Sequence, residues 1–289
     1  MMLLQQIFSG IATGCIYALI GLALILVYKA TDIINFAVGE MMMMSAFMAY
    51  TCLGILKLPY YQAFILTILF SALFGILVER LTIRPVFNAP VFSVIILTFG
   101  LGLIFKGAAG VIWTFDTLTL KSPFSMEPIK VWKFIITPLN IGNITISLIL
   151  MLLLFFFFKF TVLGTGIRAM AQNRLAAILM GIKVKRISTV TWAISSMIGG
   201  VAGILFAPII FVDTNMGVVA IKSFIGCIIG GFGSIPGCIL GGVFLGVIEA
   251  VFGYYFPTEL KQTFVFLVLI GILCMKPTGI FGVPKIKKI

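Results

Sequence analysis

The chain has 289 residues, of which 62% are hydrophobic and 10% are charged, and its mean hydropathy is +1.26. Soluble domains carry about 25% charged residues, so this composition excludes a water-soluble globular protein. The formal net charge of +12 does not indicate nucleic acid, because most Lys and Arg residues lie in short links between apolar runs, as the positive-inside rule requires of cytoplasmic loops. We therefore expect an all-α, polytopic helical membrane protein with no nucleic-acid partner.

The sequence contains no histidine, which is the commonest general base and the commonest metal ligand. None of the five cysteines belongs to a C-x-x-C pair, and Asp, Glu, Ser and Cys form no cluster typical of an active site. We therefore expect no catalytic residue and no metal site.

Nine apolar segments follow one another along the chain. About 20 such residues are needed for one helix to cross the hydrocarbon of a bilayer. The first segment is too long for the core of a signal peptide, and we interpret it as a retained membrane helix. We expect about eight or nine membrane segments, including short or re-entrant ones. The nine segments cover residues 7–28, 41–56, 61–82, 91–113, 143–162, 187–208, 218–232, 237–256 and 262–276.

Two of these segments, 41–56 and 218–232, are nearer 15 residues than 20 and lie one in each half of the chain. Such lengths are typical of re-entrant or broken helices, which are tolerated where loose backbone lines a cavity or packs inside protein. A glycine-containing link, 35–40 or 230–237, borders each of them. Paired interrupted segments indicate an internal repeat and the place of a transport path. The candidate path or gate residues in these links are Asn35, Gly39, Glu40, Gly233 and Ser234.

The distribution of Lys and Arg predicts the orientation of the chain. The link 164–186 carries five basic residues and no acid, so we expect it in the cytoplasm. The carboxyl-terminal tail is expected there too, because it carries Lys276, Lys285, Lys287 and Lys288. The link 114–140 lies one crossing before 164–186 and is expected outside. The amino terminus is outside if all nine segments cross and inside if 41–56 is re-entrant, and both readings stay open.

Glycines four residues apart recur in the apolar segments. This spacing leaves one face of a helix without side chains and lets the backbones of two helices approach closely. The pairs are Gly10 and Gly14, Gly226 and Gly230, Gly237 and Gly241, and Gly242 and Gly246.

The stretch 167–180 has good helix propensity and contains no Gly or Pro, and we expect the helix to end at Gly181. Its apolar residues recur at steps of three and four, so they share one helix face, and the other faces carry Arg168, Gln172 and Ala176. A partner protein could bind such a helix on the cytoplasmic surface, or the helix could bind acidic lipid head groups. The residues alone leave these two interpretations open.

The run Ala176-Ala177, three further residues and Gly181 resembles the cytoplasmic loop motif of ABC-importer permeases, in which a short coupling helix docks on the ATPase subunit. It departs from that motif because Leu175 stands where a Glu is usual and the downstream Ile-x-Leu-Pro is missing. The whole segment 166–182 is more similar to the branched-chain amino acid permease family. Three other stretches resemble the same family in the same order along the chain, namely 34–40, 224–237 and 276–282.

The resemblance covers almost the full chain, with Lys276 where the family often has Arg and Val38 where it often has His. It implies a single transmembrane permease domain over residues 1–289 with a cytoplasmic coupling segment at 164–186. It also implies a multi-pass protein of a bacterial-type plasma (inner) membrane that is a transport subunit and not an enzyme. The residues expected to couple it to the ATPase are Arg168, Ala169, Asn173, Arg174, Ala176, Ala177, Gly181 and Ile182.

The function that the resemblance implies is translocation of branched-chain or related amino acids by an ATP-driven ABC importer. The alternatives are a permease for urea, amides or a sugar in the same class, or an ion-coupled secondary transporter. The implied partners are ABC ATPase subunits, a second related permease subunit or a homodimer copy, an extracytoplasmic substrate-binding protein, and membrane lipids. The chain has no G-x-x-x-x-G-K-[ST] motif, so we expect ATP on the partner subunits and no cofactor on this chain.

Glu249 is a charged residue inside an apolar segment, on the same helical face as Gly242, Gly246 and Gly253. Exposing its carboxylate to lipid would cost several kcal/mol, so we expect it to point into the bundle. There it either hydrogen-bonds a neighbouring helix or lines the transport route, and we favour the first.

Two further charges lie in or beside apolar segments. Glu40 either caps a helix that begins at Met41, where a negative charge is favourable, or forms a gate or subunit contact, and both interpretations stay open. Lys106 either snorkels to the membrane surface or pairs with an acid.

Overall fold

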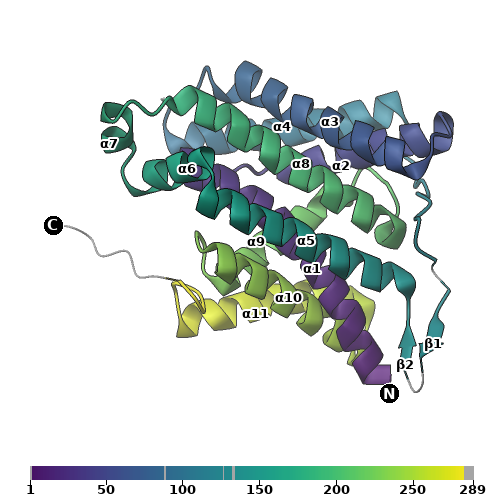
Figure 1. Cartoon of the computed structure of the whole chain (residues 1–289). Coiled ribbons are helices and arrows are strands. Elements are labelled where there is room, and N and C mark those ends of the chain that lie inside the picture. The colour runs from purple at the N-terminus through teal and green to yellow at the C-terminus, as the bar shows by residue number, and fades with distance from the viewer. Residues whose placement is uncertain (1, 88, 126, 132–133, 283–289) are drawn as a thin grey trace. The chain divides into compact units, whose positions relative to one another are not determined.

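The computed structural model describes residues 2–87, 89–125, 127–131 and 134–282 (Figure 1). The α-helices are α1 (Met2–Thr31), α2 (Val38–Tyr50), α3 (Tyr60–Val78), α4 (Val91–Ile112), α5 (Pro138–Phe160), α6 (Val162–Gln172), α7 (Arg174–Leu179), α8 (Val184–Ile210), α9 (Val219–Gly230), α10 (Ile235–Tyr255) and α11 (Lys261–Met275). Short π-helical turns η1 (Thr51–Ile55) and η2 (Glu79–Ile83) continue α2 and α3, and the 3-10 turns η3 (Met216–Val218) and η4 (Thr258–Leu260) precede α9 and α11.

The predicted all-α membrane class is confirmed. Seven helices in the described part of the chain are long and apolar enough to span a bilayer, and Met216–Gly230 and Lys261–Met275 are shorter apolar helices. The segment predicted at 41–56 is longer than expected and covers Val38–Ile55, which makes 18 residues, because the helix begins three residues earlier. The predicted outside link 114–140 adds one small antiparallel hairpin of β1 (Ile129–Val131) and β2 (Phe134–Ile136).

The chain divides into two compact units. Unit 1 comprises residues 1–25, 124–148 and 221–289, and unit 2 comprises 26–123 and 149–220. The boundary between them falls inside α1 and inside α5, so each of these helices contributes to both units. The single permease domain expected for residues 1–289 and the expected internal repeat stay predictions.

Unit 2 is organised around α8, which packs against α3 and α2 (Figure 1). Small residues allow this close packing. A Cβ at Gly75 of α3 would come within 2.5 Å of the Trp192 carbonyl oxygen, and a Cβ at Gly203 of α8 would come within 2.8 Å of the Met42 carbonyl oxygen. Between the same helices, Ser71 donates a hydrogen bond of 2.8 Å to Ser45. Because lipid offers no water to polar groups, such buried hydroxyls need partners inside the bundle.

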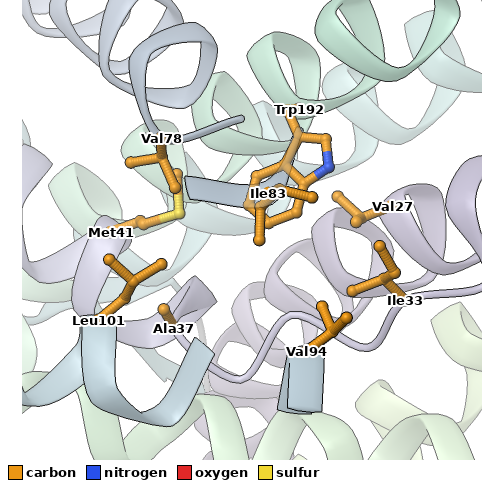
Figure 2. Close-up of a cluster of buried hydrophobic side chains, with 9 residues drawn as sticks. All are labelled: Val27, Ile33, Ala37, Met41, Val78, Ile83, Val94, Leu101 and Trp192. Atoms are coloured by element: carbon orange, nitrogen blue, oxygen red, sulfur yellow. The ribbon is translucent and has the colours of Figure 1, made fainter. Parts of the chain in front are cut away.

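The link between α1 and α2 lies at the level of the membrane spans and not at their ends. Ile33 and Ala37 from this link belong to a buried apolar cluster with Trp192 (Figure 2). Trp192 is the ninth residue of the 27-residue helix α8, which places it about 12 Å along that helix. Leu101, also in the cluster, is the eleventh residue of α4. The break between α1 and α2 at residues 32–37 therefore lies alongside α4 and α8, between the ends of these two helices.

The two ends of unit 2 are defined by contacts between links. Arg84 donates a hydrogen bond of 3.2 Å to Thr189, so the end of α3 lies beside the start of α8. Leu118 and Val212 form an antiparallel β-bridge, which joins the link after α4 to the link after α8. This arrangement agrees with the expectation that the link 114–140 and the link 164–186 lie on opposite sides of the membrane.

Unit 1 is held together by glycine contacts. A Cβ at Gly226 of α9 would lie 3.0 Å from the Cα of Gly242 on α10, and a Cβ at Gly14 of α1 would lie 2.7 Å from the Cα of Val243. Gly230 also touches Gly237 across the α9–α10 turn. The predicted close approach of helices through glycines spaced four apart is confirmed at these places.

Candidate functional site

The two short segments predicted as counterparts meet at their amino-terminal ends. Gly39, in the first turn of α2, lies against the Gly217 carbonyl group of η3, and a Cβ at Gly39 would also lie 2.8 Å from Ala220. Only a glycine allows this approach, because any side chain would collide with the backbone of the facing turn. The approach joins the interrupted region before α2 to the one before α9, and this junction is called the α2–η3 junction below.

The carboxylate of Glu40 occupies the space that two glycines leave open at the α2–η3 junction. A Cβ at Gly217 would lie 2.8 Å from Glu40 Oε1, and a Cβ at Gly102 of α4 would lie 3.2 Å from Glu40 Cδ. Three elements therefore surround this side chain, which is half-buried. Gly102 and Gly217 were not singled out from the sequence, because nothing local marks them among the 30 glycines of the chain.

A cation stands beside this carboxylate. Lys106, one turn beyond Gly102 on α4, donates a hydrogen bond of 2.7 Å to Asn215 Oδ1, so its ammonium lies between two elements that both contact Glu40. The backbone N–H of Asn215 donates to Asp213 Oδ1 at 2.7 Å, which fixes the turn before η3. Lys106 thus hydrogen-bonds to an amide, and the two interpretations left open for it, snorkelling and pairing with an acid, stay predictions.

Asn35 and Glu40 have local roles that differ in part from the expected ones. Asn35 is buried, and its Oδ1 accepts a hydrogen bond of 3.0 Å from the Ala37 N–H. This turn starts α2 at Val38, with Ala37 as its N-cap residue. The expectation that Glu40 caps a helix beginning at Met41 is therefore wrong, since Glu40 is the third residue of the helix. A negative charge in the first turn is still favourable there.

Gly233 and Ser234 lie in the tight turn between α9 and α10, in unit 1. Gly233 has a φ of +95°, which favours glycine, and Ser234 Oγ accepts a hydrogen bond of 3.2 Å from the Gly237 N–H as the N-cap of α10. The structure thus assigns a turn and a cap to these two residues. Glu40 belongs to unit 2, and a role of Gly233 or Ser234 in the transport path stays a prediction.

Two of the four family-like stretches pack against each other in unit 1. The N–H groups of Ile280 and Phe281 donate to the carbonyl oxygens of Ile229 and Gly230 at 2.8 and 3.0 Å. Gly279 has a φ of +78° and allows this contact. The stretch 276–282 therefore closes over the carboxyl end of α9. Lys285, Lys287 and Lys288, on which the expected location of the tail partly rests, lie outside the described residues.

Glu249 has partners on two other helices of unit 1. Lys222 Nζ of α9 lies 2.5 Å from Glu249 Oε1, and the Tyr17 hydroxyl of α1 donates to Glu249 Oε2 at 2.9 Å. These contacts agree with the favoured interpretation, in which the carboxylate joins helices. Lys222 was missed from the sequence, although a lysine inside an apolar segment is itself a signal of a buried partner.

The coupling segment is not the continuous helix predicted over 167–180. It breaks at Asn173, whose backbone is extended (φ −156°, ψ 103°) and whose Oδ1 accepts a hydrogen bond of 3.0 Å from the Ala176 N–H. The reason is local: an asparagine side chain can satisfy the first N–H groups of a new helix, and here it caps α7. Propensity alone does not reveal the break, because it counts Asn as a tolerable helix residue.

The predicted stop at Gly181 is confirmed. Gly181 has a φ of +82°, its N–H donates to the Ile178 carbonyl at 2.9 Å, and the Ile182 N–H donates to the Ala177 carbonyl at 3.1 Å. These two bonds form a Schellman motif, which ends a helix with a left-handed residue. Ala177 is buried, whereas Ala176 and Gly181 are exposed.

The face that α7 presents is more apolar than expected. Leu175 and Leu179 are 75% and 87% exposed, so the apolar row expected to continue from Ile167 does not pack against the protein here. The break at Asn173 redirects these side chains outward. Arg174 lies over the ring of Phe87, with its guanidinium carbon 4.3 Å from the ring centroid. That contact holds α7 beside the link between α3 and α4.

Arg168 and Ala169 lie on α6, before the break. Arg168 is exposed and donates hydrogen bonds to Thr165 Oγ1 at 3.1 Å and to the Lys159 carbonyl at 3.4 Å. The eight expected coupling residues thus lie on two short helices, at the break between them and in the turn after them, and their docking role stays a prediction.

Comparison with known proteins gives a consistent result over nearly the whole chain. Residues 6–273 match the family model described as branched-chain amino acid transport system / permease component. The high-affinity branched-chain amino acid transport system permease protein LivH of Salmonella typhimurium (strain LT2) is 30% identical over 300 residues, which cover 99% of this chain and 97% of LivH. Permease protein BraD of Pseudomonas aeruginosa, from a high-affinity branched-chain amino acid transport system, is 30% identical over 99% of this chain and 98% of BraD. Among solved structures, PsaBC from Streptococcus pneumoniae in complex with Fab superposes with a TM-score of 0.48 at 13% identity, over 94% of this chain and 89% of that chain.

Proposed function

The chain belongs to the family of branched-chain amino acid transport system permease components, and from this premise we propose that it is the membrane subunit of an ATP-driven importer for branched-chain or related amino acids. It is a multi-pass membrane transport permease and not an enzyme. The proposal places it in a bacterial-type inner membrane. The proposed partners are ABC ATPase subunits, a second related permease subunit or another copy of this chain, and an extracytoplasmic binding protein. ATP is held by the ATPase subunits, and this chain binds no cofactor.

The α2–η3 junction is the observation that carries the cargo part of the proposal. An amino acid carries an ammonium and a carboxylate. Glu40 offers a negative charge, and Lys106 offers a positive charge beside it, one turn from Gly102. The amino-terminal ends of α2 and η3 meet at the same place, and helix amino termini favour carboxylates. We infer that a zwitterion passing through the permease is held here for part of its route.

Apolar surface beside the junction suits a branched-chain side chain. Phe36 stacks on Phe99, with ring centroids 4.5 Å apart, and the Phe36 N–H donates to Thr98 at 3.4 Å. Phe99 lies three residues before Gly102 on α4, so its ring is on the same side of the helix as the glycine that accommodates Glu40.

The exposed face of α7 supports the ATP-driven part of the proposal. Leu175, Leu179 and Met180 are 75%, 87% and 83% exposed. α7 lies outside the candidate membrane spans, so lipid tails do not cover these residues by default. An apolar face of this kind outside the bilayer is typical of a protein interface. We infer that an ATPase subunit covers it.

Reconstitution of the assembled complex in proteoliposomes tests the proposal. Leucine delivered by the binding protein should stimulate ATP hydrolysis and be taken up. Glu40→Gln and Lys106→Met should each lower uptake by roughly tenfold or more, since a hydrogen bond to a charged group contributes about 1.5–3 kcal/mol. Glu259→Gln removes an exposed carboxylate in unit 1 and is the matched control, expected to transport normally.

Each alternative has its own outcome in the same experiment. ATP hydrolysis stimulated by urea, an amide or a sugar, with no response to any amino acid, would leave the importer class standing and overturn the cargo. Uptake that needs an ion gradient and continues without ATP would indicate a secondary transporter. Normal uptake by both charge variants would overturn the role of the α2–η3 junction.

A further inference from the structure

A strongly basic groove lies at the end of unit 2 that carries α7. It has a volume of about 800 Å³ and opens between the end of η2 and the start of α8. Five of its ten lining residues are cationic, and none of the described residues that line it is acidic. The cations are Arg80, Arg84, Lys183, Lys185 and Arg186. Apolar residues complete the walls, namely Ile178, Ile182, Val184 and Val190.

Most of this positive charge is not neutralised by the protein. The carboxylate of Glu79, which is 1% exposed, lies 3.8 Å from Arg84 Nε and accepts a hydrogen bond of 2.9 Å from the Thr189 hydroxyl. Within the part of the chain that the structure describes, Arg80 and Arg186 form no ion pair. Several unpaired cations on one concave surface repel one another and attract an anion.

The amino-terminal end of α8 also favours a bound anion. The helix has no acidic residue in its first turn, and its N-cap residue Lys183 makes no side-chain capping bond. Lys185 and Arg186 instead place two cations at the positive end of the helix dipole, where negative charge is preferred. The positive end of the α8 dipole and cationic side chains from two separate elements therefore face the same groove.

A row of exposed leucines on α3 and on η2, which continues it, leads to this groove. Leu69, Leu73, Leu77 and Leu81 follow one another at four-residue steps and are 53–67% exposed. Residues spaced in this way share one helix face, and Arg80 stands beside Leu77 and Leu81 at its end. In a bilayer an exposed leucine row of this length contacts acyl chains. The leucine row thus leads directly into the basic groove.

We propose that this groove binds the head group of an anionic phospholipid of the cytoplasmic leaflet, with one acyl chain along the leucine row of α3. The phosphate lies among the five cations and near the start of α8, and the apolar groove walls contact the glycerol region. Because Ile178 of α7 and Ile182 of the turn after it line the same groove, the bound lipid also contacts the coupling segment. The proposal does not depend on the cargo of the permease.

Native mass spectrometry of the full-length protein in detergent, titrated with phosphatidylglycerol or with phosphatidylcholine of identical chains, measures this site directly. Arg80→Gln combined with Arg186→Gln should weaken the first phosphatidylglycerol Kd by roughly 30-fold, at about 1 kcal/mol for each cation near a lipid surface. Phosphatidylcholine binding should not change. Lys57→Gln combined with Lys121→Gln is the matched control, because these two lysines line a separate groove of about 570 Å³ that touches no residue of the first. Its phosphatidylglycerol Kd should stay within about twofold.

Four results would overturn the proposal. Unchanged phosphatidylglycerol binding by the groove variant would do so, as would an equal loss in the Lys57 and Lys121 control, which would show an unspecific charge effect. Displacement of the lipid by inorganic phosphate alone would indicate a free-phosphate site. A groove variant that binds lipid normally but no longer copurifies with the ATPase would assign the cations to an acidic protein surface. The lipid-free proteins should have equal melting temperatures, so that the comparison concerns folded molecules. If the melting temperature of the double variant is lower than that of the wild type, Lys185→Gln is used in its place.

Discussion

Lys222 of α9 and Glu249 of α10 form an ion pair within a membrane helix bundle, with 2.5 Å between Nζ and Oε1. The side chains are 25% and 12% exposed, and the Tyr17 hydroxyl of α1 completes the site at 2.9 Å. Three helices of unit 1 thus meet on one carboxylate. Glu249 shares its helix face with Gly242 and Gly246, both of which touch α1, so the pair lies where backbones are closest.

The effect of neutralising Glu249 follows from these contacts. Glu249→Gln keeps an oxygen for Lys222 or Tyr17, and we expect nearly normal transport and a small change in melting temperature. Glu249→Leu removes the carboxylate that accepts from Lys222 and Tyr17, which should cost about 1–3 kcal/mol of stability. Thermal unfolding of the purified protein and uptake by the complex measure the two effects separately.

A double variant tests whether the charges of Lys222 and Glu249 stabilise each other. Lys222→Met should destabilise by itself, by less than the about 3–5 kcal/mol typical of a fully buried pair, because both side chains retain some exposure. Combined with Glu249→Leu it should recover part of the loss, since no charge is then left unpaired. A Gln variant that melts normally but transports poorly would show instead that the charge of Glu249 acts on the route.

Ala176 is the clearest residue with which to test docking of α7. It is exposed and its backbone conformation is helical, so Ala176→Phe should fold normally and obstruct only a surface that another protein covers. We expect uptake and copurification of the ATPase to fall by at least about tenfold, equivalent to about 1.4 kcal/mol. Expression and melting temperature should not change.

Ala176→Ser is the conservative control and should behave as wild type. Gly181 is a poorer position for the same test, because its φ of +82° would strain any other residue and disturb the end of α7 directly. Full activity of Ala176→Phe would remove α7 from the ATPase interface.

Gly39→Ala tests the α2–η3 junction. The added Cβ would collide with the Gly217 carbonyl group and lie 2.8 Å from Ala220, so α2 or η3 must shift. We expect a loss of about 1–3 kcal/mol in stability, the usual result of overpacking, together with reduced uptake. Gly107→Ala on α4 has no atom within 4 Å of the new Cβ and should be neutral or slightly stabilising. Equal melting temperatures for the two variants would contradict the close approach.

Labelling of single cysteines tests the orientation. In a Cys274→Ser background, which removes the exposed native cysteine, a cysteine at Lys183 should react only with reagent on the cytoplasmic side. A cysteine at Ser122 should react only from outside, because one membrane crossing separates the link 114–140 from the link 164–186. A cysteine after Lys285 is expected on the cytoplasmic side, although this tail lies outside the described residues. Reversal at any of the three positions would overturn the orientation.

The sequence by itself determined the membrane class, the nine apolar segments, the glycine faces through which helices approach one another, and the family. These features depend on hydropathy and on residue spacing within one helix, and a bilayer allows few other structures for such segments. The end of the coupling helix at Gly181 was predictable for the same reason, since a helix stop is a local property of the chain. The named coupling residues follow from the family resemblance and not from spacing.

The tertiary structure alone decided which residues meet. Lys222 and Tyr17 lie 27 and 232 positions away from Glu249 in sequence, and no local pattern pairs them. The contact of Gly39 with Gly217 and the leucines that α7 exposes likewise depend on how separate helices pack. The break at Asn173 was missed for a different, local reason: helix propensity permits a continuous helix there, whereas the Ala176 N–H donates to the Asn173 side chain and so starts a new helix. Long-range packing chooses among conformations that differ little in local free energy, which is why the site was less predictable than the spans.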